Sequence, residues 1–222
     1  MSILKIKDNR IKTAALGTSA LYLALTLVFF LPVEIPHKIT ACVSALFIAS
    51  LWLCPWQMSL ALLFSALGDH FGSCGNFLAQ MGFFALGHIW FIVYFIDRYF
   101  KRVEPDRKLT GKAKGYLAMV IFCAIVLLCV VFFRIVPLVP AGVLSIGVSI
   151  YAILICLMLV SAMLQRSSLF ALGAILFVFS DFILAWNKFV EPVPYRHYLV
   201  LVPYFLAQWL LFIRATKYRV GP

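Results

Sequence analysis

Eight apolar runs fill almost the whole length of this 222-residue chain. Hydrophobic residues make up 64% of the sequence and charged residues 12%, a balance that water-soluble domains do not have. A helix needs about 20 mainly apolar residues to cross the ~30 Å hydrocarbon core of a membrane. We therefore predict an all-α, polytopic integral membrane protein in which residues 1–222 form a single transmembrane domain. The eight predicted transmembrane helices cover roughly residues 13–31, 38–53, 57–71, 77–97, 115–133, 140–163, 168–187 and 195–214.

The net charge of +11 would suit a nucleic-acid partner, but the positions of the charges favour another explanation. If the N-terminus lies in the cytoplasm, 15 of the 19 lysines and arginines fall on the cytoplasmic side of the predicted helices. This asymmetry follows the positive-inside rule and predicts that both termini are cytoplasmic. The basic excess then reflects topology and anionic lipids, with no role for nucleic acid. The pattern fits the inner membrane of a bacterium or the endoplasmic reticulum of a eukaryote.

Two carboxylates, Asp69 and Asp181, lie within or close to apolar runs, whereas the other six acidic residues lie in loops or at helix ends. Each lies 12 or 13 residues from the cytoplasmic end of its predicted helix, about 20 Å across a ~30 Å core. A charge there costs about 2.5–3.5 kcal/mol on insertion scales, and such residues are functional candidates by default. Two aspartates at one depth predict a shared site in the outer half of the membrane.

Other polar side chains near that depth are candidates for substrate binding, and their alternative is a structural role. Tyr204 and Gln208 are four residues apart and so share a helix face. Such residues can also serve as hydrogen bonds between helices, and lysines as interfacial side chains that reach water. Small residues at Gly68, Gly82 and Gly87 are predicted to allow close helix packing. The substrate-binding candidates are Ser65, His88, Asn187, Lys188, Lys38, Tyr204 and Gln208.

The sequence contains no motif for a metal or a cofactor, so we expect neither. HExxH, GxSxG and a phosphate-cradling glycine loop are missing, the four histidines are scattered, and Cys74 has no obvious partner. Two neighbouring carboxylates do not both ionise easily, and they can therefore supply an acid and a base without a metal. Such a pair suits an intramembrane aspartyl protease, a proton- or cation-coupled transporter or a lipid hydrolase. The GxGD motif of the protease lacks its first glycine here, where the residues are Ala66-Leu67-Gly68-Asp69.

Four segments resemble the YhhN-type lysoplasmalogenase family in order and spacing: ALLFSALGD, GHIWFIVYF, SDFILAWNKFVEPVPY and YFLAQ. The resemblance covers roughly the whole chain and implies an enzyme that hydrolyses the vinyl-ether bond of lysoplasmalogens. The products would be a fatty aldehyde and glycerophosphocholine or glycerophosphoethanolamine. The paired acidic residues of the family fall on Asp69 and Asp181. Two departures bear on substrate range: His70 stands where the family more often has an apolar residue, and FVEPVPYRHYLV adds charge.

The implied reaction is chemically suited to an aspartate pair, because vinyl ethers resist base but are cleaved by acid. We expect one aspartate to act as general acid and the other to stay ionised, stabilising the cation and orienting water. Tyr204, Gln208 and His88 would position water or the glycerol hydroxyl, while Lys188 and Lys38 would hold the phosphate. The expected partners are a lysophospholipid substrate and membrane lipids. A proton- or cation-coupled transporter and a hydrolase of another lysophospholipid remain the alternatives, and the oligomeric state is left open.

Overall fold

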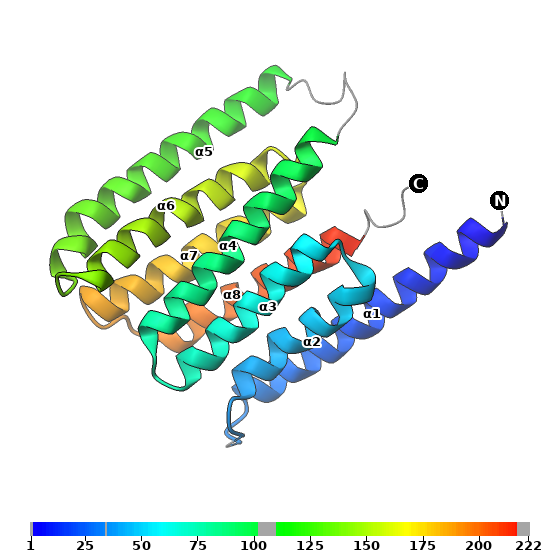
Figure 1. Ribbon diagram of the computed structural model, residues 1–222, viewed down its shortest axis with the longest axis horizontal. Helices are drawn as coiled ribbons and strands as arrows, with labels where there is room; N and C mark the ends of the chain where they lie inside the picture. Colours follow the sequence, from blue (N-terminus) through cyan, green and yellow to red (C-terminus); the bar gives the residue numbers. More distant parts are fainter. Residues whose placement is uncertain (1, 34, 102–109, 217–222) are drawn as a thin grey trace. The chain divides into compact units, whose positions relative to one another are not determined.

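The computed structural model describes residues 2–33, 35–101 and 110–216, with side chains described from residue 9 onward. Within these ranges the chain forms eight α-helices and no strand, which confirms the all-α prediction (Figure 1). Part of the predicted cytoplasmic charge, at residues 102–109 and 217–219, lies outside them. The helices are α1 (Ser2–Phe30), α2 (Lys38–Leu53), α3 (Trp56–Ser73), α4 (Phe77–Phe100), α5 (Gly111–Val130), α6 (Val143–Met163), α7 (Ser168–Phe189) and α8 (Arg196–Thr216).

The helix ends differ from the predicted bounds in three informative places. Helix α1 begins at Ser2, well before residue 13, because charged residues end an apolar run without ending a helix. Helix α6 begins at Val143 and not near residue 140, since Gly142 precedes it with a φ of 108° that a helix cannot contain. Helix α5 continues into a π-helical turn, η1 (Val131–Ile135), and a 3₁₀ turn, η2 (Val136–Leu138).

Six of the eight helices are long and apolar enough to cross a membrane, namely α1 from Asn9 onward, α4, α5 extended to Leu138, α6, α7 and α8. Helix α2 is apolar but has 16 residues, a rise of about 24 Å. Large apolar side chains lie exposed along the long helices, including Phe122, Ile125 and Phe133 on the α5 segment. Water would penalise so much exposed apolar surface. The chain is therefore a multi-pass membrane protein.

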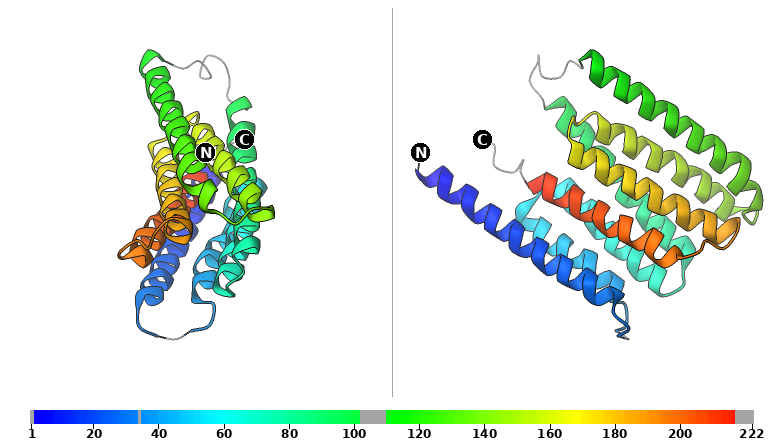
Figure 2. Two further views of the ribbon diagram at one scale, coloured as in Figure 1. Left: turned by 90° about the vertical axis from the view of Figure 1, so that its left-hand side faces the viewer. Right: turned by 180° about the vertical axis from the view of Figure 1, so that it is seen from behind.

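The chain divides into two compact units, and the boundaries fall within α4 and α8. The α1–α3 unit comprises Met1–Trp90 and Gln208–Pro222, and in it α2 packs against both α1 and α3 (Figure 1). The α5–α7 unit comprises Phe91–Ala207, and in it α6 packs against both α5 and α7 (Figure 2). Each aspartate of the predicted pair lies in a different unit.

Two glycines bring α3 and the first part of α4 into close contact within the α1–α3 unit. A Cβ atom added at Gly68 would lie 3.0 Å from the ring of Phe84. One added at Gly87 would lie 3.3 Å from the Ala61 carbonyl oxygen and the Ser65 Oγ. These positions bear out the expectation of close packing. The expectation of close packing is wrong for Gly82, where an added Cβ would meet open space because that side of α4 faces outward.

Candidate active site

Asp69 is enclosed by the first three helices. It lies near the C-terminal end of α3, and its side chain is only 2% exposed. Its carboxyl group interacts electrostatically with Tyr22 of α1 and Cys42 of α2, which are both buried. Burying a carboxyl group is costly unless polar neighbours compensate it. Tyr22 and Cys42 are two such polar neighbours of Asp69.

Three further candidates are buried in the same unit. The Ser65 hydroxyl donates to the Ala61 carbonyl oxygen at 2.9 Å, so its proton is used within α3. His88 is 1% exposed and follows Gly87, the residue in contact with Ser65. Gln208 of α8 is fully buried, and its amide atoms Nε2 and Oε1 have no hydrogen-bond partner among the described residues. An uncompensated buried amide costs about 1–3 kcal/mol, which makes Gln208 the side chain here that most requires a water or a ligand.

Asp181 has a different environment in the α5–α7 unit. It is half-buried in the second half of α7, and Tyr151 of α6 donates its hydroxyl to the Asp181 Oδ2. The preceding residue, Ser180, donates to the Val200 carbonyl oxygen of α8 at 2.8 Å, close to Pro203 within α8. These bonds fix the rotation of α7 about its axis. The sequence analysis missed Tyr151, whose only signal was a phenol near the middle of an apolar helix.

A cavity of about 50 Å³ lies beside Asp181. Its lining comes from α5, the start of η1, α6 and α7, and it is apolar apart from Tyr151, Cys156 and Asp181. Val131, the first residue of the π-helical turn, contributes to the wall. Ligand sites are characteristically apolar with a few convergent polar groups. The volume of this cavity is well below that of a whole ligand pocket, so it would admit only a short apolar segment.

Three of the remaining candidates lie at helix ends. Lys38 donates from Nζ to the carbonyl oxygens of Leu31 at 3.2 Å and Val33 at 3.0 Å, and so ties the α1–α2 connection to the start of α2. The Asn187 Oδ1 accepts from the Val193 N–H at 3.0 Å and thereby shapes the α7–α8 turn. Lys188 is exposed at the end of α7.

Tyr204 completes the predicted set and is 3% exposed. Its ring meets that of Phe177 edge-on, with the ring centroids 5.4 Å apart, and this contact joins α8 to α7 within the α5–α7 unit. Thus the structure places Asp69, Ser65, His88, Lys38 and Gln208 in one unit and Asp181, Asn187, Lys188 and Tyr204 in the other. The pairing of Asp69 with Asp181 stays a prediction.

The profile of the YhhN family matches residues 36–215. The chain belongs to the YhhN family. Lysoplasmalogenase TMEM86A of Bos taurus is 30% identical over 221 residues, covering 86% of this chain and 84% of that protein. Lysoplasmalogenase TMEM86A of Homo sapiens is 28% identical over 219 residues, again covering 86% of this chain and 84% of that protein.

Lysoplasmalogenase TMEM86B of Homo sapiens is 34% identical over 70 residues, which is 32% of this chain and 30% of that protein. No solved structure gives a significant match. The YhhN match spans both aspartates and all seven substrate-binding candidates. It also spans a polar cluster that the sequence analysis did not foresee.

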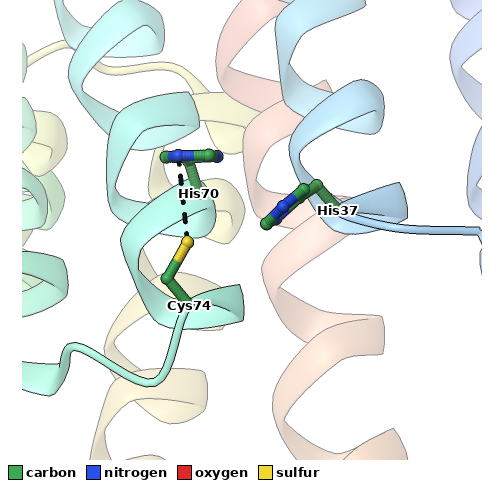
Figure 3. A group of neighbouring side chains, drawn as sticks. All are labelled: His37, His70 and Cys74. Carbon is green, nitrogen blue, oxygen red and sulfur yellow. Dashed lines mark hydrogen bonds between the residues drawn. The ribbon is translucent and has the colours of Figure 1, made fainter.

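This cluster consists of His37, His70 and Cys74 (Figure 3). The description of the histidines as scattered and of Cys74 as lacking a partner is wrong for these three residues, whose donor atoms all lie within 4.8 Å of one another. His37 is far from His70 and Cys74 in the sequence, and the helix packing brings them together. His37 immediately precedes α2 while the other two end α3, and the packing of α2 on α3 brings these ends together.

Proposed function

We propose that this YhhN protein is a lysoplasmalogenase that cleaves the vinyl-ether bond of lysoplasmenylcholine or lysoplasmenylethanolamine. The products are a fatty aldehyde and glycerophosphocholine or glycerophosphoethanolamine. The observation that carries the proposal is the relationship to two proteins named lysoplasmalogenase over 86% of the chain. A carboxyl group in the wall of an otherwise apolar cavity supports the same chemistry.

The reaction requires one proton donor and one water molecule. A proton added to the β-carbon of the vinyl ether leaves an oxocarbenium ion at the carbon bonded to oxygen. Water adds to that carbon and loses a proton, and the hemiacetal then collapses to the aldehyde and the free glycerol hydroxyl. General acid catalysis of this kind contributes about 10²–10⁴-fold to a rate.

The hydrogen bond from Tyr151 suggests how the two aspartates divide these roles. The phenol of Tyr151 donates to the Asp181 Oδ2, so the Asp181 carboxyl group acts as a hydrogen-bond acceptor in this contact. We assign Asp181 the role of stabilising the oxocarbenium ion and orienting the water, and Asp69 the role of proton donor. That both aspartates act on one substrate is part of this proposal.

The remaining candidates serve as binding residues in this scheme. Gln208, with an amide that lacks a partner among the described residues, is the strongest candidate for holding water or the glycerol hydroxyl. His88 and Tyr204 are buried and serve the same purpose. Lys188 is exposed at the end of α7 and is suited to bind phosphate as a point charge. The vinyl-ether end of the alkenyl chain enters the apolar cavity beside Asp181, whose volume of about 50 Å³ admits only a short segment of that chain.

The proposed architecture has eight transmembrane helices in one domain, with both termini in the cytoplasm. Helices α2 and α3 are joined by a short turn at Cys54 and Pro55 and pack together, so they cross or fail to cross as a pair. A pair of crossings leaves the sides of all the other helices unchanged. The basic residues of the sequence then lie mainly on the cytoplasmic side. The inner membrane of a bacterium or the endoplasmic reticulum of a eukaryote is the proposed location.

The decisive experiment measures the release of fatty aldehyde from lysoplasmenylcholine and lysoplasmenylethanolamine by purified protein in detergent. Wild type is compared with Asp69→Asn and Asp181→Asn, and gel filtration checks that each variant is folded. We expect each substitution to lower kcat about 10²–10⁴-fold. Asp97→Asn provides a matched control, because this acidic residue lies near the end of α4 and pairs with Lys101 on the surface.

Activity that survives in a folded Asp69 or Asp181 variant would remove that residue from the scheme. A folded wild type that releases no aldehyde from either lipid, but cleaves an ester or alkyl-ether lysophospholipid, would replace the substrate. No reaction with any of these lipids would contradict the hydrolase and leave the proton- or cation-coupled transporter, which needs two compartments to be measured.

A further inference from the structure

The cluster of His37, His70 and Cys74 has the composition and the spacing of a metal site. Cys74 Sγ lies 3.9 Å from His70 Nε2, and the rings of His37 and His70 lie 4.8 Å apart between centroids (Figure 3). A tetrahedral zinc ion requires ligand atoms about 3.5 Å apart. Side-chain movements of roughly 1 Å therefore convert the present arrangement into a set of three ligands.

The backbone holds the cluster at two points. His70 and Cys74 are four residues apart at the end of α3, so they lie on one face of the helix. His37 lies at the N-cap of α2 in the left-handed region, with a φ of 52°, which few residues other than glycine adopt readily.

Ser73 orients the ring of His37. Its hydroxyl donates to the His70 carbonyl oxygen at 2.7 Å, and it lies 2.6 Å from His37 Nδ1. When the Ser73 hydroxyl donates to the His70 carbonyl oxygen, His37 Nδ1 carries the hydrogen and donates to the Ser73 Oγ. The lone pair of the neutral ring then lies on Nε2. Metal-binding histidines characteristically donate their other ring N–H to such an outer partner, which fixes the tautomer.

We propose that His37, His70 and Cys74 bind a zinc ion through two imidazole nitrogens and one thiolate. Zinc accepts this mixture of nitrogen and sulfur ligands in tetrahedral geometry, and the fourth position remains for water or an anionic oxygen. The thiol proton is released to solvent when the metal binds. The ion joins the α1–α2 connection to the end of α3, the helix that carries Asp69. This inference does not depend on the proposed enzymatic activity.

The test uses the full-length protein in detergent, prepared without a histidine tag, because a tag would bind the same metals. Zinc content is measured by elemental analysis after dialysis, and affinity by competition with a chelator. Co²⁺ replaces Zn²⁺ as an optical probe of the thiolate. The cluster variants are His37→Ala, His70→Ala, Cys74→Ser and Ser73→Ala. The matched controls are His197→Ala and Cys123→Ser, which change exposed residues of the same types elsewhere.

We expect one zinc ion per wild-type chain and an affinity at least tenfold lower when any one of the three ligands is removed. Cys74→Ser should abolish the thiolate-to-cobalt absorption, and Ser73→Ala should weaken binding about 10–100-fold through the His37 tautomer. Both controls should bind like wild type. Wild type that binds no zinc, cluster variants that bind as tightly as the controls, or a cobalt spectrum unchanged in Cys74→Ser would each overturn the proposal.

Discussion

The two aspartates were predicted at the same depth of the membrane, yet the structure gives them opposite surroundings. Asp69 is enclosed among α1, α2 and α3 with only 2% of its surface exposed. Asp181 is half-buried, receives the Tyr151 hydroxyl and borders a cavity. Depth along a helix therefore does not determine the environment of a polar residue. The rotation of the helix and the identity of its neighbours decide it.

This difference is consistent with the separate roles proposed for the enclosed Asp69 and for Asp181 beside the cavity. A carboxyl group surrounded by protein is shielded from solvent, which limits proton exchange with bulk water. In the proposed mechanism, the Asp181 carboxyl group beside the cavity meets the reacting carbon of the substrate. The predictions below test whether the two surroundings have these separate consequences.

The largest contrast should appear when each aspartate is lengthened by one methylene. Asp69 is 2% exposed, so the added methylene of Asp69→Glu must enter a packed interior, and overpacking should destabilise the protein by about 1–3 kcal/mol. Displacement of its carboxyl group by about 1 Å should lower kcat about 10²-fold. The longer side chain of Asp181→Glu can extend into the cavity, so this variant should lose less stability and less kcat than Asp69→Glu. Thermal unfolding and aldehyde release measure the two effects, and equal losses would contradict the contrast.

The next largest effect should come from the tyrosine beside Asp181. Tyr151→Phe removes a hydrogen bond to a charged group, worth about 1.5–3 kcal/mol, and should lower kcat/KM about ten- to hundredfold. Tyr22→Phe is the matched variant beside Asp69 and should cost less activity, since the scheme needs no ionised carboxylate there. A greater loss in Tyr22→Phe would reverse the assignment of the two aspartates.

A third variant narrows the cavity. Ala152→Phe places a ring in its wall and should raise KM about tenfold for substrates with long alkenyl chains, with a smaller change for short chains. Ile153→Phe is the control, because this neighbouring side chain is 43% exposed on the outer surface of the helix. Kinetics with a series of chain lengths separate the two variants. An equal response at every chain length would place the hydrocarbon elsewhere.

The smallest effects should distinguish the two lysines. Lys188→Gln removes an exposed point charge and should raise KM about two- to fivefold, the consequence of losing roughly 0.5–1 kcal/mol. Lys38→Gln removes the donor to the Leu31 and Val33 carbonyl oxygens, so we expect lower thermal stability with little change in KM. A KM effect confined to Lys38→Gln would assign the phosphate to the α1–α3 unit.

The sequence predicted where the helices lie along the chain. It was less informative about the role of individual residues and about which side of each helix packs inward. The bounds of α2 were predicted at residues 38–53 as observed, because a positive charge and a proline turn delimit its apolar run. The start of α1 was not, because its charged first turns continue the helix. Lys38 was assigned to phosphate binding from its type and location alone. Its hydrogen bonds to nearby carbonyl groups became visible only with the chain folded.

The sequence by itself determined that the chain is an all-helical membrane protein with two carboxylates in or near its apolar runs, because lipid demands long apolar helices and penalises each charge. Only the tertiary structure decided which side chains meet, such as Tyr151 with Asp181 and His37 with His70 and Cys74. The reason is that helices in a membrane are apolar on most faces, so their sequence does not reveal which face packs inward. Contacts between helices set that rotation, and they join residues far apart in the chain.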